Sequence, residues 1–446
     1  MSAPPPLAQR FAEAMGQCLG PDFPDHIGLA VSGGGDSMAM LHLAADWARV
    51  WGPRLHVVTV DHGLRAEAAD EARLVAAEAE AHGLRHTTLR WQGWDGQGNL
   101  QDAARRARLA LIGAWRGPVS HVLFAHTRDD QAETLLMRLA RGSGVEGLSG
   151  MAPVQRVSGA LTHASGGGPA SRDWHIVRPL LDAGRDELRH YLKVLRIPHA
   201  DDPSNDDPAY DRVRLRALLK ALGAEGLDAA RLSDTARRLR RAREALGRRA
   251  LDAAEACLLH HPDGGPAQDP GARGSVLLDR DSFAGVEADT RLRVLAAALQ
   301  FVASAEYRPR EAALEAAMDR WLAGGTATLH GCTLMTRRGC LIVAREHAAV
   351  ADLTEAAGSG RAWDARWILQ PPDNAALSVR ALGPEGLAQA KGWREATAMP
   401  RAALLSQPAL WDGERLVACR AVGHGPDHRV ALDPPGGLFP ARLFSH

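Results

Sequence analysis

The sequence predicts an α/β protein in which a doubly wound parallel sheet is followed by a helical domain and a small α+β domain. Three observations lead to this fold class. Short apolar runs alternate with helical patterns up to Ala125, an Ala/Leu/Arg-rich helical stretch occupies Leu218 to Ala256, and short strand-like runs with prolines begin at Trp363. A chain of 446 residues is long enough for about three domains, which we place at residues 1–216, 217–350 and 351–446.

Strand and helix candidates alternate in the N-terminal half. The strands are expected at Ile27–Val31, Leu55–Val60, His86–Trp91 and His121–Ala125, and the helices at Ser37–Trp51, Glu67–His82 and Leu100–Trp115. This βαβ order predicts a parallel sheet with helices on both faces. Ligands of such sheets bind beyond the carboxyl ends of the strands, where the sequence has polar clusters at residues 32–37, 61–65 and 126–133. We therefore expect one site at this edge.

Three further segments have patterns of their own. The Gly/Ser/Ala-rich stretch at residues 158–174 is interpreted as a linker-like surface insertion. The stretch "GTATLHGCTLMTRRGCLIVARE" predicts a β-hairpin that turns at Arg337 to Gly339. Residues Val350 to Arg361 are interpreted as a linker.

Composition argues against several classes of protein. The 53 Lys and Arg residues balance 53 Asp and Glu residues, so no global charge indicates a nucleic-acid or membrane partner. No window approaches the roughly 18 uninterrupted apolar residues of a membrane span, and the N-terminus lacks the apolar core of a secretory signal, so we expect a soluble cytoplasmic protein. The cysteines are scattered and fit free thiols better than a disulfide framework or a zinc ribbon; they are Cys18, Cys257, Cys332, Cys340 and Cys419.

The stretch "IGLAVSGGGDSMAML" from Ile27 combines an apolar run, a glycine cluster and a helical pattern. Glycines permit positive φ, and backbone amides at a helix N-terminus with the helix dipole make a site for an anion such as phosphate. The loop matches neither the Walker A nor the G-x-G-x-x-G pattern. We expect it to bind phosphate through Ser32, Gly33, Gly34, Gly35, Asp36 and Ser37, and the alternative is a plain structural connector.

The spacing S-G-G-x-D-S in this loop resembles the pyrophosphate loop (PP-loop) of the ATP-pyrophosphatase superfamily. Other motifs are "VDHGLR" at 60–65, "AARRAR" at 103–108, "AHTRDDQAETLLMRLARGSGVEGLSGM" at 125–151, "RPLL" at 178–181 and "DDPSNDDPAYDRVRLR" at 201–216. Together they resemble the tRNA(Ile)-lysidine synthase family. The match is strong over the first half of the chain and rests on architecture and the "LWDGERLV" segment in the second.

The resemblance implies a reaction and its participants. ATP is cleaved between its α and β phosphates with Mg²⁺ present, and C2 of the wobble cytidine of an isoleucine tRNA with a CAU anticodon is adenylated. The ε-amino group of free L-lysine then displaces AMP. The implied catalytic residues are Asp36, Asp130, Glu133, Arg105 and Arg108; Asp61 and His62 join the loop in binding ATP, Asp36 and Asp130 place Mg²⁺, and Glu133 orients the lysine ammonium.

Several of these residues also have a purely structural interpretation. Asp36 could serve as a helix N-cap, and Asp130 and Glu133 have the spacing of a capping box. Arg105 and Arg108 share a helix face, which suits a phosphate or carboxylate clamp but also a solvated basic helix. His82 and His86 are separated by Gly83 at a helix end, which argues against a metal site.

Basic residues concentrate between Arg212 and Arg249. A charge run is usually a solvated face, but in a tRNA enzyme it becomes a phosphate track. The residues expected to bind tRNA are Arg212, Arg214, Arg216, Arg237, Arg238 and Arg241. Two positions depart from the family pattern, because Leu109 follows Arg108 where an aromatic residue is common and Val213 stands within an Arg-Asn-Arg motif, so neither residue is given a role.

Two rival functions are weighed against lysine transfer. A tRNA thiolase of the same superfamily generally needs cysteines near the site or an iron–sulfur cluster, and only Cys18 lies in the N-terminal half. A non-catalytic tRNA-binding protein would not need Asp36, Asp130 and Glu133. The sequence leaves the oligomeric state open, a homodimer included.

Overall fold

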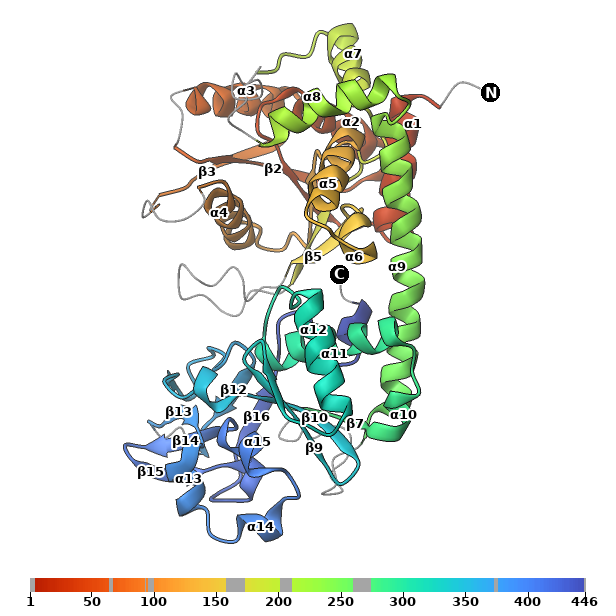
Figure 1. Ribbon diagram of the computed structural model, residues 1–446. Helices are drawn as coiled ribbons and strands as arrows, with labels where there is room; N and C mark the ends of the chain where they lie inside the picture. Colours follow the sequence, from red (N-terminus) through yellow and green to blue (C-terminus); the bar gives the residue numbers. More distant parts are fainter. Residues whose placement is uncertain are drawn as a thin grey trace. The chain divides into compact units, whose positions relative to one another are not determined.

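The computed structural model describes residues 5–63, 67–92, 94, 100–157, 173–200, 211–259, 274–372 and 376–444, and for 211–213 and 444 the backbone only. The chain forms two compact units, Met1–Arg243 and Glu244–His446 (Figure 1). Most of the predicted insertion at 158–174 lies outside the described residues. Its last residue, Trp174, is buried at the start of a strand and is not part of a linker.

The first unit is built on a six-stranded sheet. Its order is β3 (Arg85–Arg90), β2 (Arg54–Asp61), β1 (His26–Ala30), β4 (His121–Phe124), β6 (Trp174–Val177) and β5 (Val154–Val157). The first five strands run parallel, and β5 pairs antiparallel with β6 at the edge. The four predicted strands are confirmed, each end to within one residue.

Helices cover both faces of this sheet, which confirms the doubly wound arrangement. One apolar cluster joins the sheet to α1 (Leu7–Leu19), α2 (Gly35–Trp51), α3 (Ala68–Ala81) and α7 (Arg185–Leu195). Alternate strand residues such as Val58 and Val122 point the other way and pack with Ile112 of α4 (Leu100–Trp115). Leu109 joins this second cluster, so the position that departs from the family pattern serves packing.

Four more helices complete the N-terminal part of the chain. They are α5 (Arg128–Ala140), α6 (Val145–Leu148), α8 (Asp211–Ala224) and α9 (Ala229–Cys257). The last two confirm the predicted helical stretch. Ala132 and Leu135 of α5 are buried against Leu232 and Ala236 of α9. These contacts anchor the basic helix α9 beside the helix that carries Asp130 and Glu133.

The second unit contains two four-stranded sheets. The first has the order β7 (Val276–Asp279), β10 (Cys340–Arg345), β9 (Cys332–Arg337), β8 (Ala327–Leu329), and it packs with α10 (Arg280–Ala284), α11 (Ala288–Ala303) and α12 (Glu311–Leu322). The pairing of Arg337 with Cys340 confirms the predicted hairpin.

The C-terminal part of this unit is α+β, as predicted. Its sheet has the order β11 (Glu355–Ala356), β13 (Ser378–Ala381), β14 (Pro408–Asp412), β15 (Arg415–Ala418), with β12 (Trp367–Gln370) paired separately to β16 (Arg429–Leu432). Short helices α13 (Gly383–Gln389), α14 (Trp393–Ala396) and α15 (Arg401–Leu405) accompany it.

The predicted linker from Val350 to Arg361 is wrong. Val350 is fully buried in an apolar cluster, and Glu355 pairs with Val379 to add β11 to the sheet. Leu277 and Met335 of the first sheet share a cluster with Trp411 of the second. The division at residue 350 into separate domains therefore stays a prediction. Within the described chain no helix combines the length and apolarity needed to cross a bilayer.

Candidate active site at the carboxyl edge of the parallel sheet

The glycine loop joins β1 to α2, and one of its residues has a backbone conformation that favours glycine. Gly33 has φ +92°, where a side chain is strained, and a Cβ atom there would lie 3.2 Å from Glu71 Cβ. Ser37 is buried, and its hydroxyl donates to the Gly34 carbonyl (2.8 Å) and accepts from the Ser32 amide (3.1 Å). The loop is therefore locked in one shape around the N-terminus of α2.

Helix α2 begins at Gly35 without a side-chain cap. Asp36 stands in the first turn and makes no capping hydrogen bond, so the N-cap interpretation of Asp36 is wrong. An uncapped first turn next to a glycine loop leaves backbone amides to meet an anionic group. The geometry fits the phosphate-binding prediction for residues 32–37.

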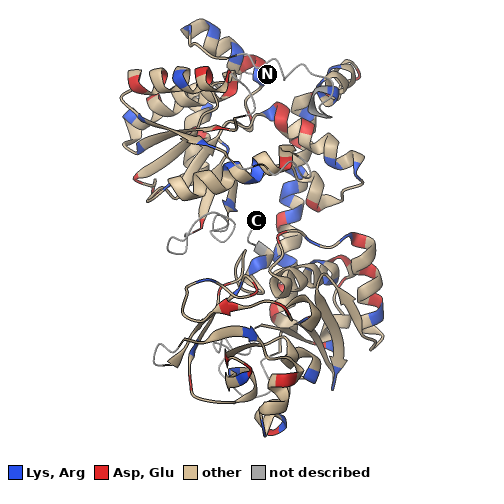
Figure 2. Ribbon diagram, turned by 90° about the vertical axis from the view of Figure 1, so that its left-hand side faces the viewer, with Lys and Arg blue, Asp and Glu red and all other residues tan. Residues whose placement is uncertain are grey.

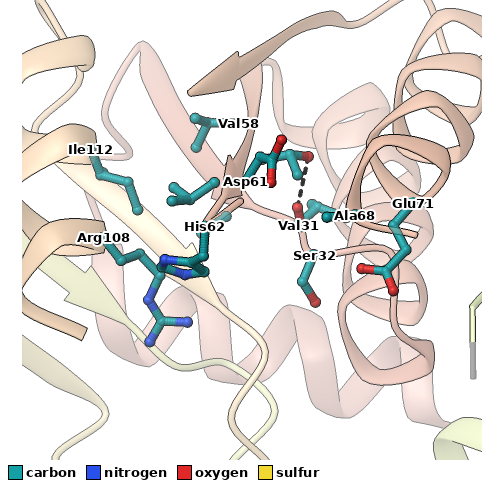
Figure 3. A pocket seen from close by; sticks show the side chains of 12 residues that line it. Val31, Ser32, Val58, Asp61, His62, Ala68, Glu71, Arg108 and Ile112 are labelled. Carbon is teal, nitrogen blue, oxygen red and sulfur yellow. Dashed lines mark hydrogen bonds between the residues drawn. The ribbon is translucent and has the colours of Figure 1, made fainter. Parts of the chain in front are cut away.

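A pocket of about 280 Å³ opens beside the loop, and Figure 3 shows the side chains that line it. Ser32, Asp61 and His62, three predicted ATP-binding residues, lie on it together with Arg108. Its remaining walls are largely apolar: Ala30, Val31, Val58, Val60, Ala68 and Ile112. Apolar walls with a few polar groups at the rim suit a nucleoside.

His62 and Arg108 are neighbours in this pocket (Figure 3). Burial, and then the Arg108 charge, lower the pKa of His62, so its imidazole is neutral at pH 7. The Arg108 guanidinium lies over the Phe124 ring, 5.1 Å from its centre. Arg108 is therefore held on the sheet rather than free in solvent, which favours the clamp interpretation for this residue.

Three predicted carboxylates meet around one arginine that the sequence analysis did not select. The guanidinium of Arg185 lies 3.3 Å from Asp36 Oδ2, 3.0 Å from Asp130 Oδ1 and 3.4 Å from Glu133 Oε1. The Arg185 backbone amide donates to Asp129 Oδ2 at 2.8 Å. One residue at the start of α7 thus links the first turns of α2 and α5.

Asp130 has a structural role in addition to this ion pair. Thr127 is the N-cap of α5, and its amide donates to Asp130 Oδ2 (2.8 Å) in a capping box. The box pairs Thr127 with Asp130, so the structural alternative of a capping box between Asp130 and Glu133 is wrong. Both oxygens of Asp130 are engaged, one by the cap and one by Arg185.

Glu133 is the most buried of the three carboxylates, with only 2% of its side chain exposed. Its Oε1 accepts from Arg216 Nε (2.8 Å) as well as from Arg185. Its Oε2 is buried without a hydrogen-bond partner among the described residues. A buried carboxylate oxygen of this kind can receive a cationic group of a substrate.

Asp36 has an electrostatic environment of its own. Burial raises the pKa of its carboxyl, and the negative charges of Asp130 and Asp129 raise it further, while Arg185 lowers it. Burial lowers the pKa of the Arg185 guanidinium, but the charges of Asp130, Asp36 and Glu133 raise it by more, so Arg185 stays charged at every accessible pH.

The predicted Mg²⁺ ligands do not fit a free ion in this arrangement. Mg²⁺ requires near-octahedral oxygen ligands, and its protein ligands are usually one or two carboxylates. Here both oxygens of Asp130 accept hydrogen bonds, and Arg185 takes one of the two oxygens of Asp36. The role of Asp36 and Asp130 in placing Mg²⁺ therefore stays a prediction.

Arginines gather next to the carboxylates. Arg178 is buried and donates to Ala152 O (2.7 Å) and Gln155 Oε1 (2.7 Å). Burial and the charges of Arg105, Arg108 and Arg138 lower the pKa of Arg178 to about 10. Arg105 is exposed but close enough to act on Arg178, so the predicted pair on α4 belongs to a cationic region that can attract an anion.

The residues predicted to bind tRNA have different environments. Arg216 holds Glu133, Arg237 pairs with Asp234 (2.5 Å) and lies 3.6 Å from Asp182, and Arg238 and Arg241 are exposed on α9. Arg214 is exposed, and the side chains of Arg212 and Val213 lie outside the described residues. Figure 2 shows acidic and basic residues mingled over both units, in line with the balanced composition.

One feature of the sequence points to Arg185, namely its position at the start of a helix. It is the first residue of α7, where a cation opposes the helix dipole and an acidic residue is favoured. The next two residues, Asp186 and Glu187, follow that preference. An arginine in the unfavourable position indicates a partner outside the helix.

The fold, the glycine loop and the adjoining pocket define a protein with a PP-loop ATP-binding domain. Residues 7–222 match the family model of the PP-loop domain. Three curated relatives named tRNA(Ile)-lysidine synthase are similar along the chain. The protein of Ruegeria pomeroyi is 41% identical over 95% of both chains.

The other two relatives come from a Bradyrhizobium species (45% identical over 70% of this chain and 86% of its own) and from Bradyrhizobium diazoefficiens (47% identical over 67% and 80%). Similarity of this extent and coverage shows the family. The chain belongs to the tRNA(Ile)-lysidine synthase family.

Proposed function

We propose that the protein is an ATP-dependent ligase that converts the wobble cytidine of an isoleucine tRNA with a CAU anticodon to lysidine. One observation carries the proposal. The glycine loop at residues 32–37 contributes Ser32 to the pocket and Asp36 to the carboxylates that contact Arg185, so the pocket and the acidic cluster both adjoin this loop. A nucleotide, a base and a small cationic substrate can therefore meet there.

The reaction has two steps. The O2 atom of the cytosine attacks the α-phosphorus of ATP, a P–O bond forms, and pyrophosphate leaves. The ε-nitrogen of lysine then attacks C2, the C–O bond to AMP breaks, and the amine loses a proton. The amides of the loop and the N-terminus of α2 stabilise the pyrophosphate charge, and Arg105 and Arg108 offset charge on the α-phosphate.

Lysine binding is assigned to Glu133. Its Oε2 atom is buried without a hydrogen-bond partner among the described residues, and Oε1 is fixed by two arginines, so the carboxylate is oriented before substrate arrives. Mg²⁺ accompanying ATP is included in the proposal. So are a cytoplasmic location, a homodimeric state, and contacts of Arg214, Arg238 and Arg241 with tRNA phosphates.

Thiolation is the weaker alternative because the cysteines are unsuited to it. No cysteine is among the residues that line the pocket. Burial raises the pKa of Cys332 and of Cys419 to about 12, and that of Cys18 to about 11, so none of these thiols is ionised at pH 7.

Mass analysis of isoleucine tRNA incubated with the protein, ATP and isotopically labelled lysine tests the proposal. The expected product carries the lysine label on the wobble nucleoside, with AMP and pyrophosphate released in equal amounts. Sulfur in the nucleoside would identify a thiolase. Tight tRNA binding without AMP release would identify a non-catalytic protein.

A further inference from the structure

Arg185 occupies the centre of the acidic site. Three nitrogens of its guanidinium each contact a different carboxylate, at 3.3 Å to Asp36, 3.0 Å to Asp130 and 3.4 Å to Glu133. Only 17% of the side chain is exposed. A guanidinium is planar and permanently charged, so it can hold three anionic groups in one fixed arrangement.

The backbone fixes Arg185 as firmly as the side chain. Its amide donates to Asp129 Oδ2 (2.8 Å), and the Arg128 amide donates to Ala183 O (2.9 Å). These two bonds join the starts of α5 and α7. The guanidinium is therefore part of the folded site and not a surface side chain that swings in.

The arrangement places a protein cation where two carboxylates would otherwise attract a metal ion. Asp36 and Asp130 are 94 positions apart in numbering and both turn an oxygen toward Arg185. The negative charges of Asp130 and Asp129 act on Asp36, so without Arg185 these like charges would be left uncompensated. Like charges so placed bind a divalent cation or take up a proton.

We propose that Arg185 is a built-in counter-cation that excludes free divalent metal ions from Asp36 and Asp130 in the ATP-free protein. Arg185 is a positioning residue, since it pairs with both carboxylates and orients them before ATP binds. A divalent ion then reaches the site only with the phosphates of ATP. This inference rests on the proposed function for the use of ATP.

Mn²⁺, titrated into the full-length protein without ATP and followed by electron paramagnetic resonance, tests the exclusion. Wild-type protein is expected to leave millimolar Mn²⁺ free. Arg185→Met should bind one Mn²⁺ at least about tenfold more tightly than wild type, because one positive charge is removed from beside the carboxylates. Arg189→Met is the matched control on the same helix, since Arg189 is 66% exposed and lies 3.8 Å from Asp186.

Two results would overturn the proposal: Mn²⁺ binding by ATP-free wild-type protein that Asp36→Asn abolishes, and a folded Arg185→Met variant with no gain in Mn²⁺ affinity. If Arg185→Met does not fold, Arg185→Lys replaces it. This variant keeps the charge and should still exclude Mn²⁺, and tight binding by it contradicts the proposal. Neither tRNA nor lysine is present, so these outcomes are independent of whether wild-type protein forms lysidine.

Discussion

Asp36 shows how one residue can be important for the site and nearly neutral for the fold. It makes no cap for α2, and burial together with neighbouring acids raises the pKa of its carboxyl, so its charge is held in place mainly by Arg185. Such a carboxylate contributes little net stability. Asp36 instead contributes a negative charge to the site.

Asp36→Ala is expected to leave the melting temperature nearly unchanged and to lower adenylation by on the order of a hundredfold, the usual loss when one charge-stabilising group is removed. Release of pyrophosphate in the presence of tRNA measures the adenylation step. Asp46→Ala, on the same helix and paired with exposed Arg49 at 2.6 Å, is the control. A folded Asp36→Ala variant with an unchanged rate would show that Asp36 has no part in the chemistry.

Helix α9 divides its arginines between two tasks. Arg240 donates to Met151 O (3.0 Å) and Arg243 to Ser149 Oγ (3.0 Å), so these two hold the loop after α6. Arg238 and Arg241 are exposed and are left to meet phosphates. Neither a solvated face nor a phosphate track therefore describes every arginine of α9.

The double variant Arg238→Gln/Arg241→Gln should weaken tRNA binding and lower the slope of log K against log salt by about one unit for each lost phosphate contact. Melting temperature should not change, because both side chains are exposed. Arg240→Gln/Arg243→Gln is the matched control variant. It should lower the melting temperature, because both side chains hold the loop after α6. Binding by the first variant with wild-type affinity and salt slope would leave these arginines as a solvated surface.

Histidine pairs tie neighbouring elements of the first unit together. His26 Nδ1 lies 2.9 Å from His56 Nε2, and His121 stacks on His175 across β4 and β6 with ring centres 4.8 Å apart. Burial, and then the partner histidine, lower the pKa of His121 to about 4 and that of His56 below its usual range. Protonating both histidines of a pair costs free energy, because two like charges would then lie close together.

A third group, His42, Glu78 and His82, has the composition of a metal site. Arg49 contacts His82 Nδ1 (3.0 Å) and can only donate, so His82 Nε2 carries the proton shared with His42 Nδ1 (3.0 Å). His42 Nε2 then donates to Glu78 Oε2 (3.0 Å). Every ring nitrogen is used, which makes the group a hydrogen-bond chain. His86 is not part of this chain, because its Nε2 lies 2.9 Å from Thr59 Oγ1.

These histidines predict a loss of stability in acid. The pKa values of His56, His82 and His121 are lower in the folded state, so below pH about 6.5 the unfolded chain binds protons that the folded chain rejects, and the free energy of unfolding falls. Melting temperature should drop between pH 7.5 and pH 5. In a His121→Gln/His175→Gln variant the drop should be smaller. Equal drops in the variant and the wild type would contradict this origin.

At the scale of the whole molecule, all five cysteines are free thiols. Cys332 and Cys419 are fully buried in the second unit. Replacing them with alanine would keep their surroundings apolar. No step of the proposed reaction uses a thiolate, because the nucleophile is an external amine. Removal of the cysteines can therefore distinguish lysine transfer from thiolation.

A variant with every cysteine changed to alanine should still modify tRNA if circular dichroism shows that it folds. The rate should rise with pH near neutrality, since the free lysine ε-amine has a pKa near ~10.4 and attacks unprotonated, unless another step limits. Lysidine content of the tRNA measures the outcome. Loss of modification in a folded cysteine-free protein would sink the assignment of lysine as the nucleophile.

The sequence by itself determined the parallel sheet, its polar edge and the family, because periodicity, the glycine loop and turn chemistry act over a few neighbouring residues. Ser32, Asp61 and His62, which the sequence predicts to bind ATP, line one pocket, since strands of a parallel sheet end at a common edge. Those signals do not depend on how distant segments pack.

Only the tertiary structure decided which side chains meet at that edge. Arg185 lies 149 positions from Asp36 in the chain, and its contact with three carboxylates follows from the docking of α7 against α2 and α5. The burial of Val350 and the anchoring of Arg240 arise in the same way. Ion pairs and buried contacts depend on distances through space, and the spacing of residues along a sequence does not encode those distances.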